Sequence, residues 1–132
     1  MRKILMAVMA LFTLGAVLTV TGCSTSQSTV SLVGVDEFAQ TATSSGTEVI
    51  DVRTPAEFAA GHLQGATNID VEGGAFSQGI ADLDKSKTYA VYCRSGNRSR
   101  TATQQMADAG VTHVVELAGG INAWIAAGQP VA

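Results

Sequence analysis

The chain has 132 residues, which is room for one domain with a modest single core. Its 8 basic and 11 acidic residues leave a formal net charge of −3 at pH 7. This acidic balance, without a basic stripe that carries interleaved aromatic residues, argues against nucleic-acid binding.

The first residues have the pattern of an export signal. Two basic residues precede an uncharged, mostly apolar run over 4–20, and the run ends in Val20-Thr21-Gly22-Cys23, which resembles a bacterial lipobox. We therefore expect residues 1–22 to be a lipoprotein signal peptide and Cys23 to be acylated after cleavage. A permanent membrane-anchor helix is the alternative, because the run approaches the about 20 residues that span a bilayer. The small residues and the cysteine at its end favour cleavage.

The residues that follow predict a tether and a location. Residues 23–29 are uncharged and rich in serine and threonine, so we expect a flexible tether here, followed by a domain over 30–132. Acyl chains on Cys23 would hold the protein at a bacterial membrane, facing the periplasm or the cell exterior. If Cys23 carries lipid, Cys93 has no cysteine partner within the chain and is a free thiol.

From residue 30 onward, short β-prone segments alternate with helix-prone segments. We expect strands at 30–33, 48–52, 67–69, 88–92 and 114–117, and helices at 35–42, 55–60, 75–83, 99–109 and 121–127. The helix over 55–60 is signalled by the capping box Thr54-Pro55-Ala56-Glu57, with proline at the first helical position. This alternation predicts an α/β fold, a parallel sheet of about five strands with helices on both faces.

The loop after the strand 88–92 carries the chemistry. Cys93 stands at the end of this strand, and a glycine-containing turn leads from it into the next helix. A thiol so placed faces backbone N–H groups and the positive end of a helix dipole, which lowers its pKa and favours the thiolate. We expect Gly96 to supply a positive φ in this turn. Arginines at 94, 98 and 100, in a chain that is otherwise acidic, favour small anions at the loop.

Three motifs resemble those of one family. Cys93-Arg94-Ser95-Gly96-Asn97-Arg98-Ser99 resembles the C-x-x-G-x-R-S active loop of the rhodanese family of sulfurtransferases. Residues 51–69, which include Asp51-Val52-Arg53 and Gly61-His62, are similar to the family's D-x-R-x-x-x-E-F-x-x-G-H signature. Residues 117–124 are similar to its closing L-x-G-G-[IV]-x-x-W motif. The three motifs occur in the family's order, which one loop alone could not establish.

The length of the loop separates this chain from a related chemistry. Four residues stand between Cys93 and Arg98, one fewer than in cysteine phosphatases with a similar strand, loop and helix. A shorter loop encloses a smaller hollow, which suits one sulfur atom better than a phosphoryl group. The spacing therefore counts against a phosphatase or an arsenate reductase. A non-enzymatic module that carries or senses sulfide or persulfide is another alternative, and the intact cysteine counts against it.

The resemblance implies a sulfurtransferase without a cofactor. Cys93 would be the catalytic nucleophile, taking sulfane sulfur from a small anionic donor such as thiosulfate as a persulfide and passing it to a thiol or cyanide. No C-x-x-C or H-E-x-x-H motif indicates a metal site. The substrate-binding residues that it implies are Arg94, Ser95, Gly96, Asn97, Arg98, Ser99 and Arg53.

Several of these residues have two possible roles. Arg98 either holds the anionic donor or braces the loop by pairing with a carboxylate. Ser99 either donates its hydroxyl toward the loop or caps the following helix, and its position favours capping. We expect Arg53 to line the pocket or to pair with Glu57, and Asp51 to brace the end of its strand.

Three further residues are expected to be structural. The family's G-H pattern implies that His62 is a hydrogen-bonding residue near the site rather than a general base. Phe58 and Trp124 are expected in the core, as helical aromatic residues usually are.

Overall fold

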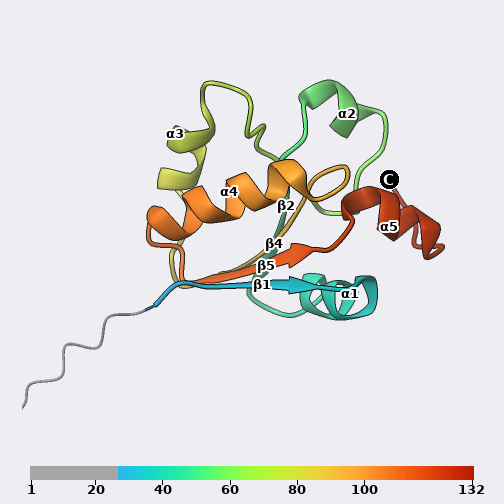
Figure 1. Ribbon diagram of the computed structural model, residues 1–132, viewed down its shortest axis with the longest axis horizontal. Helices are drawn as coiled ribbons and strands as arrows, with labels where there is room; N and C mark the ends of the chain where they lie inside the picture. Colours follow the sequence, from blue (N-terminus) through green and yellow to red (C-terminus); the bar gives the residue numbers. More distant parts are fainter. Residues whose placement is uncertain (1–26) are drawn as a thin grey trace, which may run out of the picture.

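A computed structural model describes residues 27–132 of the chain (Figure 1). The expected signal peptide, 1–22, and the expected lipid on Cys23 lie outside the described residues. The strands are β1 (Thr29–Val33), β2 (Thr47–Asp51), β3 (Thr67–Asn68), β4 (Thr88–Tyr92) and β5 (His113–Leu117). The helices are α1 (Val35–Ala42), α2 (Pro55–Ala59), α3 (Phe76–Ala81), α4 (Asn97–Asp108) and α5 (Gly120–Ala126).

The five strands form one parallel sheet in the order β1-β5-β4-β2-β3. This confirms the predicted α/β fold and places β4, which leads to Cys93, between β5 and β2. Strand β4 and helix α1 have the predicted bounds, and the boundaries of the other elements differ from the prediction by one or two residues. Strand β1 begins at Thr29, inside the expected tether, because the Thr29 N–H donates to the Thr112 carbonyl at 2.8 Å. Helix α4 begins at Asn97, two residues before the predicted start.

Helices cover both faces of the sheet. On one face α3 and α4 pack through Phe76, Ile80 and Met106 against apolar side chains of β2, β4 and β5. On the other face α1 and α5 pack together through Phe38 and Trp124, whose rings meet edge to face at 6.2 Å between centroids. Each such buried side chain stabilises the fold by roughly 1.5–3 kcal/mol.

Parallel strands bring their carboxyl ends to one edge of the sheet. In Figure 1 the strand arrows point toward this edge, where α2 and α5 lie. The segments that leave β2, β4 and β5 meet there, and in α/β sheets ligands bind at this edge. All three predicted motifs contribute residues to it. Within 27–132, no helix has the length and apolar character needed to cross a membrane.

Candidate active site

Cys93 lies directly after β4, with its side chain 1% exposed. Its Sγ accepts a hydrogen bond from the Gly96 N–H at 3.1 Å. Gly96 has φ of +107° and is the N-cap residue of α4, which confirms the positive φ expected of it. The turn therefore directs backbone N–H groups, and the start of a helix, at the sulfur atom.

The surroundings of Cys93 favour its thiolate. Burial alone raises the pKa of the thiol, but the hydrogen bond with the Ser99 hydroxyl and those from the backbone N–H groups of Ser99, Gly96 and Ser95 outweigh it. The pKa of Cys93 is consequently lowered from its ordinary value, as the position of the loop predicted.

Ser99 does not cap α4, contrary to the expectation from its position. It is the third residue of the helix and is fully buried, while Gly96 holds the cap position. The Cys93 thiol donates to the Ser99 hydroxyl at 3.4 Å between Sγ and Oγ, and that hydroxyl donates to Glu116 Oε1 at 2.7 Å. Glu116, 5% exposed on β5, was missed by sequence reasoning. Its only signal was a carboxylate within the apolar run Val114-Val115-Glu116-Leu117.

Helix α5 holds the loop through its backbone. The N–H groups of Ile121 and Asn122 donate to the carbonyls of Cys93 and Arg94 at 2.9 and 3.2 Å. Gly120 lies where the backbone of α5 meets the backbone of the loop, with φ of +60°, and a Cβ at this position would be 2.5 Å from the Cys93 carbonyl oxygen. Only glycine fits there, which explains the second glycine of the pair in the third motif.

Arg98 makes the contacts of the bracing role. Its two terminal nitrogens donate to the two carboxylate oxygens of Glu57 at 2.7 and 2.8 Å, and one of them also reaches Glu72 at 3.4 Å. The hydrogen bond from Arg98 is the largest cause of a lowered pKa at Glu57, from 4.5 to about 2. Burial of the carboxyl opposes that shift, and hydrogen bonds from Thr54 add to it.

Glu57 also completes the predicted capping box. Its backbone N–H donates to the Thr54 hydroxyl at 3.3 Å, and the Thr54 N–H donates to Glu57 Oε2 at 3.2 Å. One carboxylate therefore starts α2 and ties it to Arg98 on α4.

Of the two roles expected for Arg53, the structure gives it the position beside the pocket, and its charge pairs with Asp51 and not with Glu57. The fully buried Asp51 carboxylate accepts from the Arg53 backbone N–H at 2.9 Å, from its Nε at 3.0 Å and from its terminal nitrogen at 2.6 Å. The same terminal nitrogen donates to the Gly61 carbonyl at 2.7 Å. The Tyr92 hydroxyl, also missed by sequence reasoning, donates to Asp51 at 2.6 Å and accepts from the Leu63 N–H at 3.0 Å. Asp51 thus braces the ends of β2 and β4.

His62 is held as a structural residue. Its Nδ1 lies 3.0 Å from the Phe58 carbonyl oxygen, its ring stacks on the Phe58 ring at 3.8 Å, and its backbone pairs with Ala132. Phe58 is only half-buried in this stack, so the expectation of a core position was wrong for it, whereas Trp124 is in the core.

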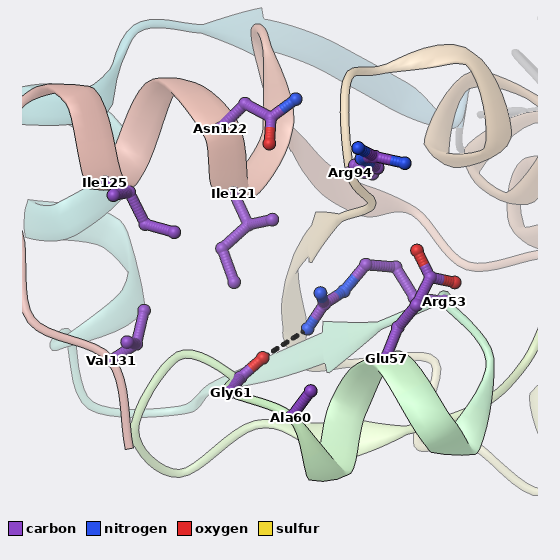
Figure 2. Close-up of a pocket in the computed structure, with 9 residues that line it drawn as sticks. All are labelled: Arg53, Glu57, Ala60, Gly61, Arg94, Ile121, Asn122, Ile125 and Val131. Atoms are coloured by element: carbon purple, nitrogen blue, oxygen red, sulfur yellow. Dashed lines mark hydrogen bonds between the residues drawn. The ribbon is translucent and has the colours of Figure 1, made fainter.

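A hollow of about 290 Å³ lies beside the loop (Figure 2). Figure 2 shows apolar side chains on one side of it, from Ile121, Ile125 and Val131, and Arg53, Glu57 and Arg94 on the other. Arg94 is exposed, and no hydrogen bond or ion pair engages its guanidinium within residues 27–132. Since Arg53 and Arg98 are paired, Arg94 is the cation available to an anion in this hollow.

The remaining loop residues do not contact Cys93 through their side chains. Ser95 and Asn97 are exposed, and their part in the site is through the backbone turn. Across the part of the chain that the structure describes, no cluster of histidine, cysteine and acidic side chains could hold a metal ion.

Comparisons with known proteins agree with this geometry. The family model of the rhodanese-like domain matches residues 34–127. The chain is 37% identical over 95 residues to thiosulfate sulfurtransferase 16, chloroplastic, of Arabidopsis thaliana, covering 64% of this chain and 79% of that protein. It is 37% identical over 79 residues to thiosulfate sulfurtransferase GlpE of Pseudomonas aeruginosa, covering 60% and 70%.

The fold matches a solved structure as well. A rhodanese-related protein from Thermoplasma volcanium superposes with a TM-score of 0.69 at 29% identity, over 77% of this chain and 97% of that one. Some relatives are much longer: the chain spans 45% of an uncharacterized Synechocystis protein and 21% of a Mycobacterium tuberculosis protein named probable adenylyltransferase/sulfurtransferase MoeZ.

Replacement of Arg98 by alanine should show how much the Arg98–Glu57 pair, which braces the loop, contributes to the free energy of unfolding, and how that contribution depends on pH. Arg98→Ala is expected to lower the free energy of unfolding by about 1 kcal/mol at neutral pH, because the pair is partly exposed. The pKa of Glu57 is lowered in the folded state, so its stabilising contribution is complete above pH 4.5 and is lost as the pH falls toward 2. The difference between wild type and variant should therefore shrink over that window, measured by denaturant unfolding at each pH.

Arg100→Ala is the matched control, since Arg100 is an exposed arginine of the same helix. An equal loss in both variants, or a difference that does not change between pH 4.5 and 2, would show that the Arg98–Glu57 pair is not a brace.

Proposed function

The chain belongs to the rhodanese-like domain family, and we propose that it is a sulfurtransferase in which Cys93 carries the transferred sulfur. The observation that carries the proposal is the buried Cys93 Sγ, which faces the Gly96 N–H at 3.1 Å at the start of α4. Relatives named thiosulfate sulfurtransferase support this class of reaction, and we extend it to thiosulfate as the donor.

The first half-reaction loads the cysteine. The Cys93 thiolate attacks the outer sulfur of thiosulfate, a new S–S bond forms, and the old S–S bond breaks as sulfite leaves with the electron pair. The N–H groups that lower the pKa of the thiol also stabilise the negative charge of the persulfide that results. No metal and no organic group is needed for this step.

The second half-reaction unloads it. An acceptor thiolate, or cyanide, attacks the outer sulfur of the persulfide, and Cys93 leaves as the thiolate from which it began. The apolar wall of the hollow gives an organic acceptor a surface to lie against, while Arg94 attracts an anionic donor.

The brace supports sulfur transfer over phosphoryl transfer. In a phosphatase the arginine of the loop must hold phosphoryl oxygens. Here both terminal nitrogens of Arg98 are bound by the Glu57 carboxylate. The short loop and the occupied guanidinium both favour a sulfur atom as the group that is held.

Replacement of Cys93 by serine tests the nucleophile. Cys93→Ser should abolish sulfur transfer from thiosulfate to cyanide, because a serine hydroxyl does not ionise near neutral pH and does not bind sulfane sulfur. Intact-mass analysis of the wild type after exposure to thiosulfate should find one added sulfur atom on Cys93. Turnover by Cys93→Ser would rule out the mechanism, and a wild type that binds thiosulfate without the added mass would indicate a passive binding module.

Replacement of Arg94 by alanine tests the proposed attraction of the anionic donor. Arg94→Ala should raise the KM for thiosulfate several-fold, with little change in the KM for cyanide at fixed thiosulfate, and added salt should have a smaller effect on the variant than on the wild type. Arg100→Ala serves again as the control. Unchanged thiosulfate kinetics in Arg94→Ala would leave the donor without an assigned cation.

We further propose that the protein is a lipoprotein of the cell envelope, anchored through Cys23. The support is the lipobox Val20-Thr21-Gly22-Cys23 after a basic start and an apolar run. Cys23→Ala should leave sulfur transfer intact and move the protein from the membrane fraction to the soluble or unprocessed pool. A variant that stays in the membrane after a carbonate wash would instead show a permanent anchor helix.

A further inference from the structure

Three side chains from three elements form a chain of hydrogen bonds that ends on a buried carboxylate. Cys93 follows β4, Ser99 is in the first turn of α4, and Glu116 is on β5. The Cys93 Sγ donates to the Ser99 Oγ at 3.4 Å, and the Ser99 hydroxyl donates to Glu116 Oε1 at 2.7 Å. The three residues are 1%, 0% and 5% exposed. The sulfur atom that reacts is thus linked through one hydroxyl to an acid.

Glu116 has no other role that the structure assigns. In the register of the sheet it lies between Val91 of β4 and Leu32 of β1, and no lysine or arginine pairs with it within residues 27–132. Strand β1 carries no ionisable side chain. A buried carboxylate that meets one hydroxyl and no cation is costly to keep in a fold, which indicates a use for it.

The other ionisable groups of the packed elements are directed elsewhere. On β4 the Tyr89 and Tyr92 hydroxyls donate to the Asp84 carbonyl and to Asp51. On α4 Arg98 is paired with Glu57 and Glu72, and it stays charged at every pH at which the protein folds. The other two, Arg100 and Asp108, are exposed.

We propose that Glu116 accepts the proton of the Cys93 thiol through the Ser99 hydroxyl and returns it at the end of each turnover. This proposal rests on Cys93 being the nucleophile of the proposed function. The chain of three groups makes the thiolate at a sulfur atom that is itself buried. Ser99 contacts the reacting atom, while Glu116 acts through it as a positioning residue.

The proton transfer balances without a further reactant. The S–H bond of Cys93 breaks as its proton passes to the Ser99 oxygen, and the proton that Ser99 held passes to Glu116 Oε1. The products are a thiolate, an unchanged hydroxyl and a neutral carboxylic acid. After the acceptor has taken the outer sulfur, the Cys93 thiolate draws the proton back along the same path. The acceptor attacks as a thiolate or as cyanide, so it brings no proton to this step and leaves with the sulfur as a persulfide anion or as thiocyanate.

The proposal predicts how the thiolate forms as the pH is raised. Cys93 and Glu116 share one proton between them, so their titrations are coupled and belong to the pair. The thiolate should appear in two steps separated by a plateau: part of it when the pair loses its first proton, and the rest when it loses the second. Ultraviolet absorbance of the thiolate in the full chain measures this, after subtraction of the same protein with Cys93→Ser, which removes the signals of Cys23 and the tyrosines.

Two variants break the chain at different points. Glu116→Gln keeps an oxygen that accepts from Ser99 but cannot take a proton, so it should reduce the two steps to one. Ser99→Ala removes the link itself and should also give one step, so the test does not depend on the folding of one variant. Asp108→Asn, a carboxylate lost from the surface of α4, should keep both steps. A melting curve for each protein verifies folding.

A single step in the wild type, or two steps that survive in both Glu116→Gln and Ser99→Ala, would overturn the proposal. The mass of Cys93 after exposure to thiosulfate is measured on the same samples. Two steps without an added sulfur atom would contradict the proposed function and leave the proton path standing. An added sulfur atom together with a single titration step would support the proposed function and overturn the proton path.

Discussion

The site depends on the backbone contact between the start of α5 and the loop that holds Cys93. Two N–H groups of the helix donate to the carbonyls of Cys93 and Arg94. The two backbones are so close there that position 120 has no space for a side chain and must be glycine. With both carbonyls bound from outside, the N–H groups of the loop are left to face inward, and the sulfur receives the Gly96 N–H. A loop without this support would be free to turn its N–H groups to solvent.

A second layer of contacts fixes what the loop can bind. The Glu57 carboxylate begins α2 and holds Arg98, and the Asp51 carboxylate holds Arg53 and Tyr92. Two of the arginines that the motifs bring to the site, Arg53 and Arg98, are therefore held in ion pairs with carboxylates of the domain itself. The proposed partner of an anionic substrate is Arg94, which lines the hollow at one of the variable positions of the motif. The fixed positions of the family motifs thus hold the loop in place, and a residue at a variable position carries a positive charge beside the hollow that is unpaired within residues 27–132.

Local signals predicted the order of the elements and the position of Cys93 in its loop well. The capping box at Thr54, the glycine turn at Gly96 and the alternation of apolar segments all act within a few residues, so they are visible in the sequence. The hydrogen-bonding partners of the charged groups were harder to predict from the sequence. Arg98 meets Glu57 across 41 positions, and Ser99 meets Glu116 across 17. Which carboxylate faces which donor is decided by strand order and register, and a single sequence does not contain these.

The common direction of the five strands determines which end of the domain would face a membrane if Cys23 carries a lipid. Strand β1 begins at Thr29, and in Figure 1 its arrow points away from this end toward α5. Because β1, β5 and β4 are parallel, Cys93, which follows β4, and the hollow beside it lie at the opposite end of the strands. Five residues lie between Cys23 and Thr29, and an extended chain of that length reaches at most about 20 Å. A lipid on Cys23 would therefore hold the domain close to the bilayer with its reactive end turned outward. Donors and acceptors would then reach the thiol from the aqueous side, and a partner embedded in the same membrane would not.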